Sequence, residues 1–262
     1  MLKVYRSQSL VTGNRNFDVY EDAFLAIEGD KIRDLGPWKK RPKVKSSQIV
    51  DVGFGLITPT LFNLHAHLPM VLFRGIAEDQ DLHTWLTQTI FPLEAKFLSP
   101  SFVQLGTELA LCESIRNGVT YFSNMYLFGA ECAKVADRMG VRGIFCQDVS
   151  NFDVPDFKNQ DDAFAAVRAL VRKYKGHPRI QGGISPHSVY GANMETLKKA
   201  ATLAKEENCG GMIHVSETKR EVTESLERFG MSPVEHIRDS GFFDSRFVIL
   251  AHTVWPTETD FK

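Results

Sequence analysis

Histidine is the residue type in this sequence whose spacing points most clearly to chemistry. His65 and His67 stand one residue apart in NLHAHLPM, residues 63–70, and IHVSE places His214 three residues before Glu217. Neutral imidazoles are good ligands for a zinc-like divalent ion, and a catalytic ion lowers the pKa of a water molecule bound to it. A carboxylate beside that water can carry its proton to a leaving group, which is the role the spacing suggests for Glu217. This chemistry is metal-assisted hydrolysis, and it needs no serine or cysteine nucleophile.

The elements that must position these residues are short apolar strands alternating with longer amphipathic segments from residue 57 onward. Strands are predicted at 61–67, 119–126, 141–149, 179–187, 211–217 and 246–252, and helices at 101–118, 129–140, 161–176, 193–210 and 232–241. Several of the helical segments begin with Ser, Asp or Asn and end in Gly, as capped helices do. The repeated alternation predicts a parallel sheet, and strands this short and apolar favour a (β/α) barrel.

Strand ends decide whether the histidines can form one site, because chemistry in a parallel barrel sits at the carboxyl ends of its strands. His65 and His67 are two apart at the end of the first strand and therefore share a face. Five of the eight histidines fall at strand ends; the other three are His187, His214 and His252, on the fourth, fifth and sixth strands. A metal site is therefore the favoured interpretation.

Each of these residues also has a purely structural interpretation. A single strand-end histidine is more often a hydrogen-bonding residue than a ligand, and Glu217 alone could be an acid favoured at a helix start. Trp85 and Trp255 are as readily packing residues as ligand contacts. The remaining histidines, His83, His177 and His236, are predicted to be surface or capping residues.

Residues 1–56 differ in pattern from the rest of the chain and are predicted to form strands of a small β unit, with turns at residues 12–14 and 29–30. The basic stretch WKKRPKVKSSQ, residues 38–48, contains one aromatic residue and lies between strand signals. A solvated loop is the favoured interpretation of that stretch.

Composition argues against several classes of partner. The 31 basic and 32 acidic side chains leave a net charge of -1, with no basic block for a nucleic acid or an anionic membrane. The four cysteines, Cys112, Cys132, Cys146 and Cys209, are widely spaced and are expected to be reduced core residues. With no secretion signal at its start and no run of about 18 apolar residues, the chain is expected to be soluble and cytoplasmic.

Five ordered motifs together resemble the amidohydrolase superfamily, in particular the branch with 5-methylthioadenosine/S-adenosylhomocysteine deaminases and related chlorohydrolases. Residues 57–96 resemble the first barrel strand and following loop, and the likeness continues through NGVTYFSNMY, ISPHSVY, IHVSETKREV and ILAHTVW. The resemblance implies a metal-dependent TIM-type (β/α)8 barrel in residues 57–262, truncated after six strands. It also implies that residues 1–56 are the amino-terminal part of a small flanking β-sandwich domain.

The resemblance also implies roles for individual residues. His65, His67 and His214 would bind one divalent ion, with zinc first and iron or manganese as alternatives. Glu217 would protonate the ring nitrogen beside the reacting carbon, and His252 would hydrogen-bond the attacking water. The substrate-binding residues would be Glu94 and His187 on the ribose side, with Trp85 lining the same pocket.

Two departures from the family pattern stand out. The family's remaining ligand, an aspartate after the eighth strand that also acts as a base, is missing, and neither Asp260 nor another aspartate stands in its context. The chain also has Gln147 where some adenosylhomocysteine deaminases carry an arginine for the amino-acid carboxylate, which disfavours adenosylhomocysteine.

The favoured function is hydrolytic deamination of an adenine-type nucleoside such as methylthioadenosine, S-adenosylhomocysteine or adenosine. The alternative within the enzyme class is a chlorohydrolase or a deaminase of another heterocycle, such as a triazine or guanine. The alternative from another class is an inactive fragment, or half of a split protein lacking the metal-binding aspartate. Expected partners are a small-molecule substrate and, as further alternatives, a second copy in a homo-oligomer or a complementing carboxyl-terminal chain.

Overall fold

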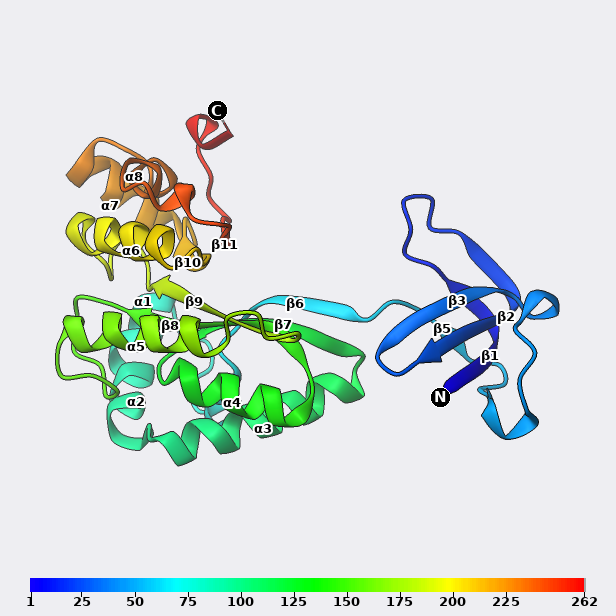
Figure 1. Cartoon of the computed structure of the whole chain (residues 1–262). Coiled ribbons are helices and arrows are strands. Elements are labelled where there is room, and N and C mark those ends of the chain that lie inside the picture. Colours follow the sequence, from blue (N-terminus) through cyan, green and yellow to red (C-terminus); the bar gives the residue numbers. More distant parts are fainter. Residues whose placement is uncertain (262) are drawn as a thin grey trace. The chain divides into compact units, whose positions relative to one another are not determined.

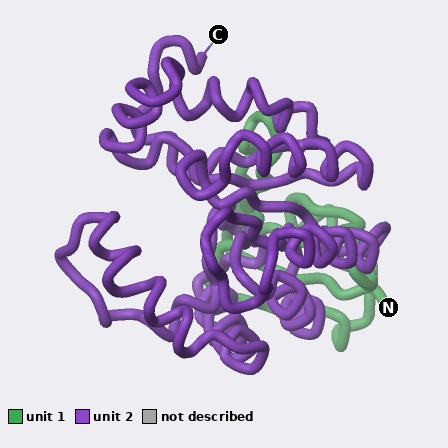
Figure 2. Tube along the Cα trace, turned by 90° about the vertical axis from the view of Figure 1, so that its left-hand side faces the viewer, with its two compact units in different colours: residues 1–60 green, residues 61–262 purple. Residues whose placement is uncertain are grey.

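The computed structural model describes residues 1–261, which form two compact units. The first unit comprises Met1–Thr60 and the second begins at Leu61 (Figure 2). None of the helices in the described residues has both the length and the apolar character needed to cross a membrane.

The first unit is a five-stranded sheet. Its strands are β1 (Leu2–Val11), β2 (Val19–Glu28), β3 (Lys31–Pro37), β4 (Ile49–Asp51) and β5 (Leu56–Ile57). The order is β3-β2-β1-β4, with β5 also paired to β1; β1, β2 and β3 run antiparallel, while β4 and β5 run parallel to β1. Val4 and Phe24 form its core, and the guanidinium of Arg41, from the basic stretch, stacks 4.1 Å from the centre of the Trp38 ring.

The second unit is built on six parallel strands in chain order (Figure 1). They are β6 (Leu61–Ala66), β7 (Val119–Tyr126), β8 (Arg142–Val149), β9 (Ile180–Pro186), β10 (Gly211–Val215) and β11 (Val248–His252). Although β6 and β11 end the order, the rings of His65 and His252 lie 4.8 Å apart, so the carboxyl ends of the two edge strands curve toward each other. This barrel-like parallel sheet confirms the fold class expected from the sequence.

Helices follow the strands in the expected alternation. They are α3 (Pro100–Arg116), α4 (Gly129–Met139), α5 (Gln160–Lys173), α6 (Met194–Glu206), α7 (Lys219–Phe229) and α8 (Pro233–Asp239). All of these helices except α4 are capped at their start by a side chain that accepts a backbone N–H, for example Ser99 for α3 and Asn159 for α5. Helix α7 was not predicted, although Val222, Leu226 and Phe229 stand at the i, i+4 and i+7 spacing of a helical face. Leu226 and Phe229 are 45% and 42% exposed, so this stripe is only partly buried.

A second helical region without a sequence prediction lies between β6 and α3, where only a loop was expected. It contains η3 (Leu68–Phe73), α1 (Leu82–Thr84), the π-helical η4 (Trp85–Ile90) and α2 (Phe91–Phe97). Asp81 caps its helical part by accepting the backbone N–H groups of His83 and Thr84. The π turn moves the side chains away from the 3.6-residue period, which explains why periodicity did not reveal it.

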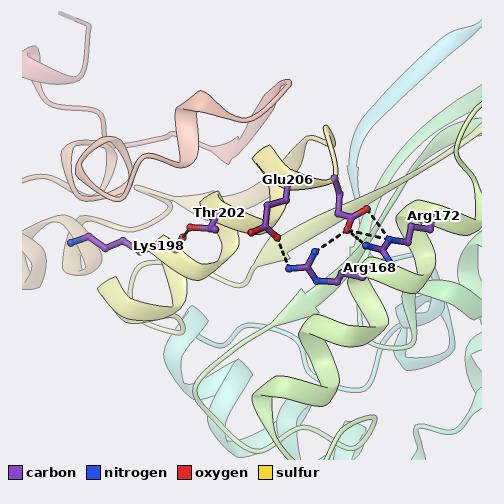
Figure 3. Close-up of polar contacts among 6 residues, drawn as sticks. Arg168, Arg172, Lys198, Thr202 and Glu206 are labelled. Carbon is purple, nitrogen blue, oxygen red and sulfur yellow. Dashed lines mark hydrogen bonds and ion pairs between the residues drawn. The ribbon is translucent and has the colours of Figure 1, made fainter.

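The outer helices are joined by ion pairs that Figure 3 shows between α5 and α6. Arg168 contacts Glu206 at 2.6 Å and Glu207 at 2.8 Å, and Arg172 contacts Glu207 at 2.6 Å. The two guanidinium groups hold the pKa of Glu207 at about 2. These contacts fix the spacing of the two helices that cover β9.

Close packing of β7 against β8 explains why residue 143 is a glycine. A Cβ at Gly143, in β8, would lie 2.2 Å from the carbonyl oxygen of Phe122 in β7. No side chain fits there without displacing backbone, so glycine is required for this pair of strands to approach.

Two sequence expectations about burial were wrong. Cys112 is exposed, whereas Cys132, Cys146 and Cys209 are buried free thiols as expected. His236 was expected to be a surface or capping residue but is only 4% exposed, because its face of α8 packs against α7 and brings its ring 4.6 Å from that of Phe229.

Candidate metal and substrate site

A cavity of about 180 Å³ opens at the carboxyl ends of the strands of the second unit. All eight residues for which the sequence suggested a site role line it: His65, His67, His187, His214, His252, Glu217, Glu94 and Trp85. Position at a strand's carboxyl end therefore correctly predicted that His65 and His252, 187 positions apart, line the same cavity. Trp255 is 47% exposed and is not among the lining residues.

Backbone carbonyls fix the tautomers of His67 and His214. His67 Nδ1 lies 2.6 Å from the Met125 carbonyl oxygen, and His214 Nδ1 lies 2.7 Å from the His187 carbonyl oxygen. Because a carbonyl oxygen only accepts, each Nδ1 carries the proton, and each neutral ring presents an Nε2 lone pair. These two Nε2 atoms face each other at 3.1 Å. Neither can donate to the other, so this contact is not a hydrogen bond between neutral rings.

Burial keeps these imidazoles neutral. Loss of hydration lowers the pKa of His67 to about 4 and that of His65 to about 3, and it lowers the pKa of His214 well below its usual range. The neighbouring imidazoles add to the effect on His65 and His214. At neutral pH the cluster therefore consists of uncharged rings, which is the form that binds metal.

The cluster fits a divalent ion. His65, His214 and His252 each offer a ligand atom within 4.8 Å of the others, and His65 Nδ1 is buried with no hydrogen-bond partner among the described residues. Two nitrogens bound to one zinc-like ion at 2.0–2.1 Å lie about 3 Å apart, as the Nε2 atoms of His67 and His214 do. A cation between them removes the repulsion of two facing lone pairs. The donor set present thus suits a divalent ion.

Glu217 and His252 form a pair on the rim of the cluster. Glu217 Oε1 lies 3.5 Å from His252 Nε2, and both side chains are about one quarter exposed, at 22% and 27%. Burial raises the pKa of Glu217 and lowers that of His252. A carboxyl group with a raised pKa is suited to giving a proton to a substrate and taking one back.

Local backbone geometry places this pair. Glu221 accepts the backbone N–H of Ser216 at 3.0 Å and that of Glu217 at 2.8 Å, which anchors the loop after β10 to the start of α7. Ser216 (φ 49°) and His252 (φ 75°) adopt left-handed backbone conformations at the ends of their strands. Such conformations cost about 1–3 kcal/mol each and concentrate at functional sites.

Glu94 and His187 line the side of the cavity expected to hold a sugar. Glu94 is 8% exposed and accepts the Tyr126 hydroxyl at 2.6 Å; its burial raises its pKa to about 7. The His187 ring lies 5.3 Å from the Phe152 ring, and burial lowers its pKa to about 3. Apolar side chains complete the wall of the cavity. They belong to Phe152 and to the helical region after β6, where they are Leu82, Leu86, Ile90 and Phe91.

Sequence reasoning missed three polar residues of this cavity. Tyr126 ends β7, Asp148 lies at the end of β8, and Tyr190 follows β9; all three line the cavity. The strand-end rule applied to the histidines would have found Tyr126 and Asp148 had it been extended to other polar residues.

Residues named as departures from the family pattern lie outside the cavity. Gln147 is 2% exposed; its side chain accepts the N–H of Gly129, the first residue of α4, and donates to Asp156 in the connection between β8 and α5. Asp260 accepts the Ser232 hydroxyl and the backbone N–H of Thr257.

Comparison with known proteins places this geometry in a family. The family model described as the amidohydrolase family matches residues 56–262. The chain belongs to the amidohydrolase family. Among curated members, a 5-methylthioadenosine/S-adenosylhomocysteine deaminase of Thermodesulfovibrio yellowstonii is 38% identical over 255 residues, covering 96% of this chain and 58% of the relative. A 5'-deoxyadenosine deaminase of Methanothrix thermoacetophila is 36% identical over 98% of this chain and 59% of the relative.

Solved amidohydrolase structures have the same fold. An adenosine deaminase from Xanthomonas campestris with bound zinc superposes with a TM-score of 0.88 at 27% identity, covering 98% of this chain and 58% of that one. An atrazine chlorohydrolase from Arthrobacter aurescens with zinc has a TM-score of 0.85 at 21% identity over 98% of this chain and 62% of that one, a likeness of fold alone. This amidohydrolase chain thus spans about three fifths of the length of the relatives it matches.

Proposed function

We propose that the protein to which this chain belongs is a zinc-dependent hydrolase that deaminates an adenine-type nucleoside, such as methylthioadenosine, S-adenosylhomocysteine or adenosine. The observation that carries the proposal is Glu217 Oε1 at 3.5 Å from His252 Nε2, on the rim of a cluster of neutral imidazoles in one cavity. The curated relatives with deaminase names support the reaction class. We infer further that residues 1–56 belong to the flanking β domain and residues 57–262 to the barrel.

His65, His67 and His214 would hold the ion, which when bound would lower the pKa of a water molecule. His252 would accept a hydrogen bond from the attacking water and orient it toward the amino-bearing ring carbon. Glu217 would give its proton to the ring nitrogen beside that carbon. Overall, the water oxygen becomes the carbonyl oxygen on the ring carbon, one water proton stays on the ring nitrogen, and the other leaves with the amino group as ammonia.

The sugar side of the substrate would lie against Glu94 and His187, with Trp85 and the neighbouring apolar side chains covering the ring. Their apolar surface removes water from the reacting atoms, which strengthens the hydrogen bonds made there. The apolar wall also suits a substrate with an apolar substituent on its sugar.

Ammonia release is the direct test. The full natural protein should contain about one zinc ion and release ammonia from adenosine derivatives; absence of metal, or no release from any purine, contradicts the proposal. Chloride released from chlorotriazines, or ammonia from guanine, would establish the alternative heterocycle hydrolase.

Glu217→Gln tests the assigned proton donor. We expect kcat to fall by about 10²–10⁴ with little change in bound metal, because the amide cannot transfer the proton. Glu224→Gln, on the exposed face of α7 where Glu224 contacts Arg220 at 2.6 Å, is the matched control and should retain activity.

A further inference from the structure

An acidic group of side chains lies in the substrate cavity away from the imidazole cluster. Asp148, at the end of β8, and Glu94 both line the cavity and are each 8% exposed, and Asp156 lies close enough to both to raise their pKa values. Lysine and arginine are missing from the residues that line the cavity within the described chain. A cationic ligand here would meet no competing lysine or arginine, and it would favour the ionised form of these carboxyl groups.

Asp148 has no partner that would make it a structural residue. Its Oδ1 is buried and unbonded among the described residues, whereas the comparable carboxyl of Glu94 accepts the Tyr126 hydroxyl. Asp156 is held by the Phe128 N–H at 2.8 Å and by the Gln147 side chain at 2.9 Å, so those donors are already used. An unbonded buried carboxyl group is costly unless a ligand completes it.

Burial and the two neighbouring acids raise the pKa of Asp148 well above its usual range. A cationic hydrogen-bond donor stabilises such a carboxyl group in its ionised form more than a neutral donor does. The cation offsets both the lost hydration and the repulsion from Glu94 and Asp156. An anionic group in the same place would meet three carboxyl groups.

We propose that Asp148, backed by Glu94 and Asp156, is a subsite for a positively charged, hydrogen-bond-donating substituent of the nucleoside, such as a protonated amine. The assignment rests on the proposed deaminase function and narrows its substrate class. Among the candidate substrates named above, the subsite disfavours S-adenosylhomocysteine, whose sugar substituent carries a carboxylate.

Three adenosine derivatives that differ in one substituent test the subsite in the full, metal-loaded protein. They are 5'-amino-5'-deoxyadenosine, 5'-deoxyadenosine and adenosine-5'-carboxylate, which are cationic, neutral and anionic at pH 7. We expect kcat/KM for ammonia release to be about tenfold higher for the amine than for 5'-deoxyadenosine, and lowest for the carboxylate. Calorimetric binding should follow the same order.

Asp148→Asn should lower the ratio of amine to 5'-deoxyadenosine efficiency by about tenfold. A merely structural role would lower both efficiencies equally and leave the ratio unchanged, so an unchanged ratio overturns the assignment. Asp161→Asn, an exposed acid at the start of α5, should retain the wild-type ratio.

The outcomes separate the two proposals. Ammonia release from all three nucleosides at similar efficiency would overturn the subsite while leaving the deaminase function standing. No release from any of them by folded, metal-loaded protein would overturn both.

Discussion

Removing the Tyr126 hydroxyl tests how the cavity accommodates a buried carboxyl group. Tyr126 and Glu94 are 5% and 8% exposed, and the hydroxyl donates to Glu94 Oε1 at 2.6 Å. Burial raises the pKa of Glu94 from 4.5 to about 7, and the Tyr126 hydrogen bond opposes that shift. Tyr126→Phe should therefore raise the pKa of Glu94 further.

The sign of the pH effect is set by proton binding. The folded protein holds the Glu94 proton more tightly than the unfolded chain does, so this group lowers stability as pH rises from 4.5 to about 7. The rise in the pKa of Glu94 from 4.5 to about 7 makes this loss of stability about 3 kcal/mol at pH 8, at about 1.36 kcal/mol for each pH unit. The Tyr126 hydroxyl limits this loss of stability. Its hydrogen bond contributes about 1.5–3 kcal/mol when Glu94 is charged but only about 0.5–1.5 kcal/mol when Glu94 is neutral.

We expect Tyr126→Phe to lower the free energy of unfolding by about 2–3 kcal/mol at pH 8 but by about 1 kcal/mol at pH 5. Urea unfolding followed by circular dichroism at both pH values measures the difference. Tyr121→Phe, on the same strand, is the control and should show equal losses at the two pH values. Glu94→Gln should remove the pH-dependent part. Equal losses for Tyr126→Phe at pH 5 and pH 8 would refute the reasoning.

Three further changes test other features. Gly143→Ala should destabilise by about 3 kcal/mol or more, since its Cβ would lie 2.2 Å from the Phe122 carbonyl oxygen; a wild-type urea midpoint would contradict this. His67→Ala should weaken zinc binding by more than the roughly 10–100-fold that loss of an outer-shell partner costs. Elemental analysis of the bound metal measures this, with His83→Ala as the control. Equal metal content in both variants would argue against His67 as a ligand. Glu207→Gln should lower the thermal midpoint at pH 7, but this difference should vanish as pH falls through about 2, where wild-type Glu207 is protonated. Glu227→Gln is its exposed control, and a difference that persists at pH 2 would rule out the ion pairs as its cause.

The strands of the barrel could be predicted because each is a short apolar run bounded by turn residues. Segments 119–126 and 141–149 correspond to β7 (Val119–Tyr126) and β8 (Arg142–Val149) almost residue for residue. Position at a strand's carboxyl end then sufficed to bring His65, His214 and His252 together, since parallel strands place those ends on one rim.

Other features depend on tertiary contacts that no local pattern carries. The helical region from Leu82 to Phe97 includes a π turn, which disturbs the helical period. Helix α7 is the exception, because Val222, Leu226 and Phe229 stand at helical spacing between the capping residues Thr218 and Gly230, and this local pattern was overlooked. The acidity of the cavity is invisible in the sequence because Glu94 lies in α2, whereas Asp148 and Asp156 lie at and after the end of β8, and their mutual effect arises only when folding buries them together.

The facing nitrogens of His67 and His214 have a consequence for biosynthesis. The two residues are 147 positions apart, so at about 5–20 residues per second the ribosome makes the second about 7–30 s after the first. With His65, His67 and His214 as the proposed ligands, His65 and His67 would offer an incoming metal ion only an open, weakly chelating pair during that interval. Selective metal binding would then wait for β10 to join the sheet, and the choice of ion would depend on the ions available to the folding intermediate at that moment.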